Sequence, residues 1–159
     1  MDDKSVFTAF VDKWVGTAKA SQSVRQNLSQ IERALQITLP LSYRGFVEEY
    51  GTPSTAWLLE SIVAGGHELA DVASFIDLPE VVATTRDYEA AGMEPGYVGI
   101  ADDCMGNLFL FRTADCVGRP QDAAVWFFDH DFVTVDQVAP TFVSWLREYL
   151  DLEVVAGAG

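Results

Sequence analysis

The spacing of hydrophobic residues predicts two helices at the start of the chain. Val6, Phe10 and Trp14 recur every four residues, which indicates a helix over residues 5–18. The stretch SQSVRQNLSQIERALQI (21–37) has a clearer apolar stripe, and we expect a second helix there. The stripe consists of Val24, Leu28, Ile31 and Leu35, and the residues able to cap the start of this helix are Ser21 or Ser23.

Three further stretches have a helical pattern. In LPLSYRGFVEEYG (39–51), Pro40 can open a helix and Gly51 can end it. We also expect helices in LPEVVATTRDYEAAG (78–92) and in VAPTFVSWLREYL (138–150). The expected apolar faces are Tyr43, Phe46, Val47 and Tyr50 in the first of these, and Val138, Phe142, Trp145, Leu146 and Tyr149 in the last.

The period changes after TPST (52–55) to one typical of strands. We expect short strands in AWLLE (56–60) and SIVAG (61–65), with a break at Gly65 and Gly66. Four runs rich in β-branched and aromatic residues follow, namely YVGIA (97–101), NLFLFRT (107–113), AAVWFFD (123–129) and FVTV (132–135). Helices first, strands in the middle and a helix last predict an α+β fold, in which helices pack on an antiparallel sheet.

Length and composition favour a single globular domain. The 159 residues fit one domain over 1–159, with an extra N-terminal helix in 1–19 and a flexible tail at 155–159. No apolar run approaches the ~20 residues of a membrane span, and the acidic, polar N-terminus is unlike a secretory signal. We therefore expect a cytoplasmic protein that makes no membrane contact. Cys104 and Cys116 are expected to be reduced thiols at opposite ends of one strand.

The charge is strongly acidic and unevenly distributed. The chain has 24 acidic and 10 basic residues, a formal net charge of −14. Residues 1–45 hold four acids and six bases, whereas residues 46–159 hold twenty acids and four bases. Such a field repels nucleic acid, whose binding proteins need a basic surface, and it speeds encounter with a basic partner. An acidic surface also serves solubility alone, and composition does not separate these two roles.

The stretch GIADDCMGNLFLF (99–111) superficially resembles a calcium loop. Such a loop needs oxygen ligands at alternating positions, but Cys104 stands at the third position and apolar residues follow. Gly106 and Asn107 tolerate positive φ, and apolar runs flank them. The stretch therefore predicts a β-hairpin whose turn displays Asp102 and Asp103.

The other stretches give little evidence for a metal, catalytic or cofactor site. In FFDHDF (127–132), consecutive strand residues point to opposite faces, so a polar turn is favoured over a metal site. No nucleophile elbow, phosphate loop or dinucleotide motif occurs, and no catalytic residue, metal ligand or cofactor is predicted. Trp57 and Trp126 are expected in the core; if exposed beside an acidic residue, they would instead be interface anchors.

The segment IERALQITLPLSYRGFVEEYG (31–51) resembles the signature of the SUKH superfamily, the Smi/Knr-type domains. The later segments SIVAGGHEL, VVATTRDYEAAGMEPGYVGIADDCMGNLFLF, AAVWFFDHDF and VAPTFVSWLREYL are similar to the family pattern in the same order. The resemblance covers roughly residues 20–150. Thr52 and Pro53 follow Gly51 where a second glycine is common, and Gly65 and Gly66 blur the first turn.

The resemblance implies a strongly twisted antiparallel sheet with helices at the N-terminus, in the middle and at the C-terminus. It implies a non-enzymatic protein, in the bacterial branch an immunity protein that neutralises a cognate toxin of a polymorphic or contact-dependent system, such as a nuclease. A basic toxin and an acidic inhibitor suit one another. The carboxylates at the sheet edge and its turns are therefore expected to bind the partner: Glu94, Asp102, Asp103, Asp129, His130 and Asp131, with Glu48, Glu49 and Glu60 as second choices.

Two alternatives remain open from the sequence. One is a regulatory protein-interaction module of the same fold that has no toxin partner. The other is a small metal-dependent hydrolase that uses Asp102, Asp103, Asp129 and His130. The oligomeric state is not predicted.

Overall fold

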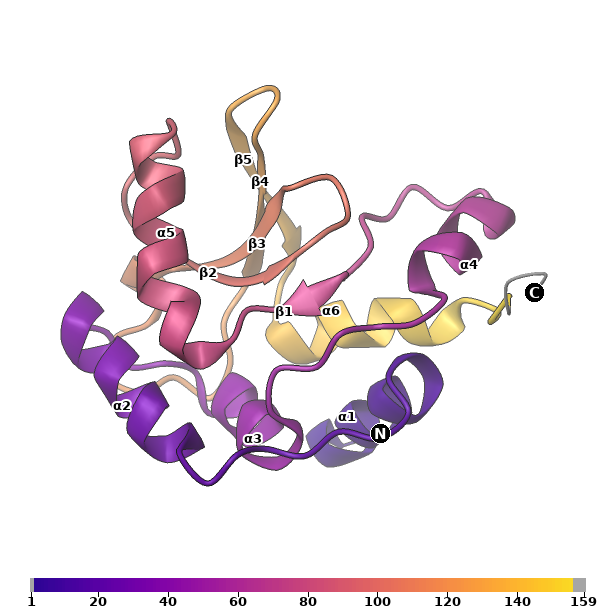
Figure 1. The fold of residues 1–159 in the computed structure, drawn as a ribbon, viewed down its shortest axis with the longest axis horizontal. Coiled ribbons are helices and arrows are strands. Elements are labelled where there is room, and N and C mark those ends of the chain that lie inside the picture. Colours follow the sequence, from indigo (N-terminus) through magenta and orange to yellow (C-terminus); the bar gives the residue numbers. More distant parts are fainter. Residues whose placement is uncertain (1, 156–159) are drawn as a thin grey trace.

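A five-stranded antiparallel sheet forms the centre of the molecule, and helices cover it (Figure 1). The computed structural model describes residues 2–155. Its strands are β1 (Ser74–Phe75), β2 (Tyr97–Asp102), β3 (Leu108–Arg112), β4 (Val125–Asp129) and β5 (Thr134–Ala139), and they lie in the sheet in chain order. Its α-helices are α1 (Asp3–Trp14), α2 (Val24–Leu35), α3 (Leu41–Tyr50), α4 (Leu58–Gly65), α5 (Val81–Ala90) and α6 (Phe142–Glu148). The predicted α+β fold is confirmed.

The two faces of the sheet pack against different helices, because neighbouring residues of a strand point to opposite sides. On one face, the ring of Phe109 lies 4.7 Å from that of Trp145 in α6. On the other face, Phe128 lies against Tyr88 of α5, with 6.1 Å between the ring centroids. Alternation along β3 and β4 thus provides both contact surfaces.

The helix α5 approaches the sheet closely at Gly99. The backbone N–H of Gly99 donates a buried hydrogen bond of 3.0 Å to the hydroxyl of Thr85 in α5. A Cβ atom at this position would lie only 3.3 Å from Leu108. The absence of a side chain at Gly99 therefore leaves room for Leu108 of β3, next to the bulge that interrupts the pairing of β2 with β3.

An aromatic cluster fills the space between the sheet and the helices α1, α3 and α6. Phe46 of α3 lies 4.9 Å from Phe75 and 5.8 Å from Phe142, measured between ring centroids. Phe10 of α1 contacts the same cluster at 6.4 Å from Phe46. Edge-to-face aromatic pairs contribute about 0.5–1.5 kcal/mol each beyond the burial of their area, so this cluster makes a rigid base for the sheet.

Most of the predicted helices are confirmed. Pro40 and Gly51 flank α3 as expected, and Gly51 has a φ of 72°. Ser23 stands at the N-cap of α2, but its hydroxyl makes no capping bond and instead accepts from the side chain of Asn27. The predicted flexible tail at 155–159 lies outside the described residues except for Val155.

The predicted secondary structure is wrong at two places. Residues 58–65 form the helix α4 and not two strands, because Leu58 and Ile62 lie four residues apart on one buried face and Gly66 ends the helix with a φ of 66°. An apolar run this short does not distinguish the two periods. Val138 belongs to β5 and not to the last helix, which begins after Thr141 with a capping box between Thr141 and Ser144.

Candidate partner-binding surface

Two turns at the same end of the sheet are joined by Asn107. The carboxylate of Asp103 accepts hydrogen bonds from the backbone N–H of Asn107 at 2.8 Å, from its side-chain amide at 2.9 Å and from the N–H of Met105 at 2.9 Å. The side-chain oxygen of Asn107 accepts from the N–H of His130 at 3.0 Å and lies 2.6 Å from its Nδ1. We call these two segments, residues 102–107 and 129–133, the acidic turn surface.

The structure brings five of the predicted site residues together on this surface, but it does not expose them equally. His130 and Asp131 are exposed, and Asp129 is half-buried. Asp103 is only 8 % exposed, so the prediction that the turn displays it is wrong. Its three hydrogen bonds hold it inside the turn, where it shapes the loop instead of facing a partner.

The carboxylates at the end of β2 create a negative local field. Burial raises the pKa of the Asp102 carboxyl, and the charges of Asp103 and Asp71 raise it further. Asp71 is 6 % exposed and accepts from the N–H of Cys104. Within residues 2–155, no Lys or Arg forms a salt bridge with these three carboxylates. The negative charge of these carboxylates is therefore not neutralised by a basic side chain of the described residues.

Exposed apolar side chains lie among these charges. Phe132 is 78 % exposed, Val133 55 % and Met105 66 %. Val133 also has a φ of 55°, which is unusual for a β-branched residue. Sequence reasoning missed the exposure of Phe132 and Val133, because FVTV reads as a strand; the polar triplet Asp129–Asp131 before it was the available signal of a longer turn.

A second exposed aromatic residue borders this region. Trp57 stands at the start of α4, is 45 % exposed and has a φ of 66°, so the prediction that it lies in the core is wrong. A hollow of about 380 Å³ lies beside it, and Glu60, Asp71 and Cys104 contribute to its wall. Glu60 thus lies on the same hollow as Cys104, which belongs to the turn of Asp103. Trp126, by contrast, is half-buried under the guanidinium of Arg112, 4.9 Å from its ring.

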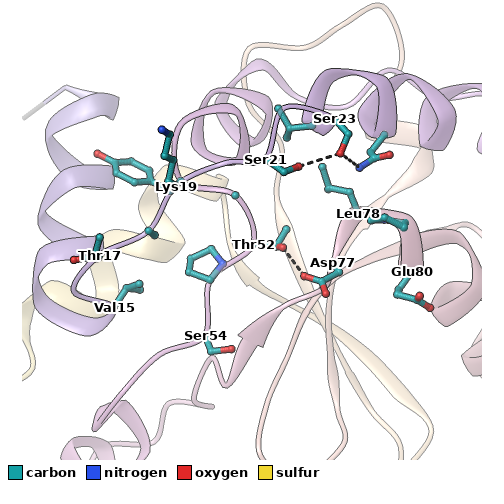
Figure 2. Close-up of a pocket in the computed structure, with 17 residues that line it drawn as sticks. Val15, Thr17, Lys19, Ser21, Ser23, Thr52, Ser54, Asp77, Leu78 and Glu80 are labelled. Carbon is teal, nitrogen blue, oxygen red and sulfur yellow. Dashed lines mark hydrogen bonds between the residues drawn. The ribbon is translucent and has the colours of Figure 1, made fainter.

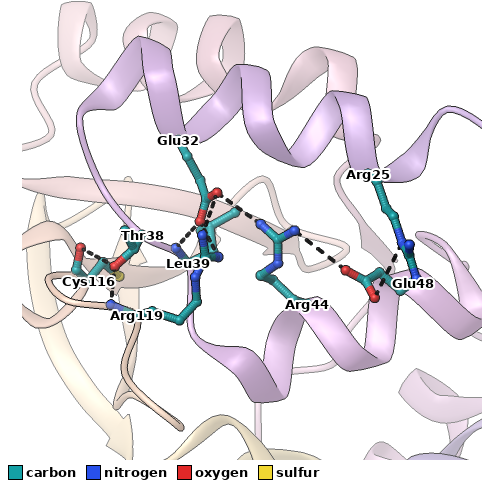
Figure 3. Close-up of polar contacts among 8 residues, drawn as sticks. All are labelled: Arg25, Glu32, Thr38, Leu39, Arg44, Glu48, Cys116 and Arg119. Atoms are coloured by element: carbon teal, nitrogen blue, oxygen red, sulfur yellow. Dashed lines mark hydrogen bonds and ion pairs between the residues drawn. The ribbon is translucent and has the colours of Figure 1, made fainter.

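The structure does not bring the remaining predicted residues to the acidic turn surface. Glu94 is exposed in the loop between α5 and β2, and this loop runs to the far end of the hairpin, where Gly96 accepts from Thr113 at 2.8 Å. Glu49 is exposed on α3. Glu48 lies in an ion-pair network with Arg44, at 3.5 Å, and is therefore part of the scaffold (Figure 3).

This ion-pair network joins three segments that are distant in the sequence. Glu32 of α2 accepts from Arg119 at 2.6 and 3.1 Å and from Arg44 of α3 at 2.9 Å (Figure 3). It also accepts from the backbone N–H of Leu39 at 2.7 Å. A carboxylate with this many partners fixes the loop after β3 against the two helices.

A larger hollow than the one beside Trp57 lies elsewhere, between the α1–α2 loop, the end of α3 and the segment before α5 (Figure 2). Its volume is about 570 Å³. Thr52 donates to Asp77 at 2.7 Å inside it, and Figure 2 shows Lys19 on the opposite side. The described residues that line it include no His or Cys.

The two cysteines have thiols of raised pKa. Burial raises the pKa of the Cys104 thiol to about 11 and that of the Cys116 thiol to about 12, so both are protonated at neutral pH. Both are free. Over residues 2–155, no group of three His, Cys, Asp or Glu side chains is placed to hold a metal ion.

The comparison with protein families assigns the chain to a class. The model of the SMI1 / KNR4 family (SUKH-1) matches residues 25–148, from α2 to α6. The chain therefore belongs to the SMI1 / KNR4 family, as its sequence motifs suggested, and α1 lies before the matched region. A search of curated proteins finds no match. No helix within the described residues is long and apolar enough to cross a membrane.

Proposed function

We propose that this chain is an immunity protein that binds and neutralises a cognate protein toxin of a polymorphic or contact-dependent system. It acts in the cytoplasm, performs no reaction of its own and needs no cofactor. Membership of the SMI1 / KNR4 family is consistent with this role. The acidic turn surface, with Glu60 at its border, is the proposed contact, and a nuclease is the best-suited class of toxin because its active cleft is basic.

One observation carries the proposal, namely a surface that combines acidic groups, none of them paired with a described Lys or Arg, with exposed apolar side chains. Residues 87–111 and 120–146, which include both turns, contain no Lys or Arg. Acidic groups steer a basic partner and raise its association rate, while central aromatic side chains such as Phe132 supply much of the affinity of protein interfaces. The surface therefore supports rapid and tight binding of a cationic protein.

A growth-rescue experiment tests the proposal. The toxin domain encoded next to this gene is expressed from an inducible promoter, alone and together with this chain. We expect growth to stop with the toxin alone and to recover when the chain is present, and the two purified proteins to form a stable complex. If growth does not recover while both proteins are soluble, the proposal is wrong. Pull-down of only housekeeping proteins would favour the regulatory module instead.

A matched pair of variants tests whether the toxin binds at the acidic turn surface. Asp131→Lys reverses a charge on the acidic turn surface, and Asp12→Lys makes the same change on the exposed side of α1. We expect the first to slow association with the toxin and the second to leave it unchanged. Higher salt should slow association of the wild type, because exposed charges are screened beyond about 8–10 Å.

A further inference from the structure

The two edges of the sheet differ in how far other segments of the chain cover them. At one edge, β1 has two residues, and the segment before α4 covers it: Ser54 forms a bridge with Ser74, and the N–H of Phe75 donates to the carbonyl of Pro53 at 3.0 Å. At the other edge, β5 has six residues. Its only strand neighbour in residues 2–155 is β4. The outer side of β5 thus has free backbone groups.

The strand β5 is also unusually exposed for a strand of this length. Thr134, Asp136, Gln137 and Val138 are exposed, and Val135 is partly buried. Immediately before them lies the protruding Phe132, which is 78 % exposed. The β4–β5 hairpin reaches beyond the helices at the top of Figure 1. Another chain can therefore approach the outer side of β5 without moving a helix.

An open edge of this kind is protected against unspecific pairing by charge and irregularity. Between Val125 and Trp126 the pairing register of β4 shifts, so that Val138 has no partner in β4 and forms a bulge. Asp136 lies in the regular part of β5, and its side chain makes no ion pair or hydrogen bond with the other described residues. The regular, accessible part of the edge is thus residues 134–137, and it carries a negative charge.

We propose that an extended basic segment of the toxin adds to this sheet as a sixth strand, pairing with the backbone of β5. The proposal rests on the proposed function and specifies how that contact is made. In strand addition, main-chain hydrogen bonds provide affinity and alternate side chains provide specificity. A Lys or Arg opposite Asp136 completes a cross-strand ion pair, and such opposite-charge pairs stabilise a sheet. Phe132 at the end of the strand is the apolar anchor.

Charge decides between the possible occupants of the edge. A second copy of this chain would bring a second acidic hairpin, with its own Asp129, Asp131 and Asp136, to this edge, and like charges at an interface are costly. The hairpin from Val125 to Ala139 contains no Lys or Arg to compensate. A basic segment of another protein suits this edge, and a homodimer does not.

Hydrogen exchange of the complex tests the backbone pairing directly. The probe is a catalytically inactive variant of the toxin domain encoded beside this gene, and the readout is the exchange of amide protons in 134–138, free and bound. We expect slower exchange in the complex for the amides that face outward. If wild-type protein binds the toxin while all these amides exchange at the free rate, strand addition is wrong and the proposed function stands. If the wild type does not bind the toxin, both are wrong.

Charge variants and the oligomeric state complete the test. We expect Asp136→Lys to weaken toxin binding by about tenfold or more, because a like charge replaces the attractive pair. The control Asp12→Lys on α1 should change toxin binding by less than about twofold, because salt screens exposed charges that lie far from the interface. Equal effects of the two variants would contradict the proposal. The free protein should be monomeric; a dimer with protected β5 amides would assign the edge to a second copy and overturn it.

Discussion

Nδ1 of His130 lies 2.6 Å from the side-chain oxygen of Asn107, and this contact joins the two turns of the acidic turn surface. The same oxygen accepts from the backbone N–H of His130, and the amide of Asn107 donates to the buried carboxylate of Asp103. Asn107, itself 9 % exposed, is thus the connecting residue between the β2–β3 and β4–β5 hairpins. Its geometry determines how the exposed residues of both turns are presented together.

Replacing Asn107 should therefore destabilise the protein. Asn107→Ala removes the donor to Asp103 and the acceptor for His130, and unpaired buried polar groups cost about 1–3 kcal/mol. We expect a loss of that size in the free energy of unfolding, measured by urea denaturation. His130→Ala is the control: it keeps the backbone bond to Asn107 and should cost less than about 1 kcal/mol. Equal losses in the two variants would contradict the assigned role of Asn107.

The strands of the second half of the chain could be predicted from the sequence, because their side chains alternate between two buried faces and turn residues separate them. The helix α4 could not, since eight mostly apolar residues fit either period and only the buried pair Leu58 and Ile62 distinguishes them. For the candidate site, the sequence placed the acidic turns correctly along the chain. It could not reveal that Asp103 points inward, because this depends on the side chain of Asn107.

A second prediction concerns Asp102 and pH. Burial raises the pKa of its carboxyl in the folded protein above the ordinary value of 3.8, so the folded state favours the protonated form. The resulting stabilisation is present at pH below the unfolded pKa and is lost as pH rises through the folded pKa. At pH 7 the ionised, partly buried carboxylate therefore destabilises the fold.

Removing this charge should stabilise the protein at neutral pH. We expect Asp102→Asn to raise Tm at pH 7 by up to about 2 °C, a modest change because the group retains part of its hydration. The gain should shrink below pH 4. Asp12→Asn on the exposed side of α1 is the control and should not show this trend. A lower Tm for Asp102→Asn at pH 7 would contradict the electrostatic argument.

The Glu32 network should contribute more to stability than a surface ion pair. Glu32→Ala leaves Arg44 and Arg119 without the carboxylate that they share, and it removes the acceptor of the Leu39 N–H. We expect a loss of about 2–4 kcal/mol, somewhat below the cost of breaking a fully buried pair. The matched control is Asp115→Ala, which breaks the exposed pair with Arg112. That change should cost less than about 1 kcal/mol. If urea denaturation gives the same loss in the free energy of unfolding for Glu32→Ala and Asp115→Ala, the network contributes no more than an exposed ion pair.

Replacing an exposed aromatic residue should affect toxin binding without a large effect on the stability of the fold. Phe132 and Trp57 are 78 % and 45 % exposed, so their replacement by Ala should change the free energy of unfolding by less than about 1 kcal/mol. If the acidic turn surface contacts the toxin, Phe132→Ala removes a central apolar anchor and should weaken binding by at least about thirtyfold, corresponding to ~2 kcal/mol. Calorimetric titration with the inactive toxin domain measures both variants. A large effect of Trp57→Ala with none of Phe132→Ala would move the interface from the β4–β5 turn to α4. That result would contradict the proposed contact. Trp57 lies only at the border of the acidic turn surface, and an interface centred on α4 would leave β5 outside the contact.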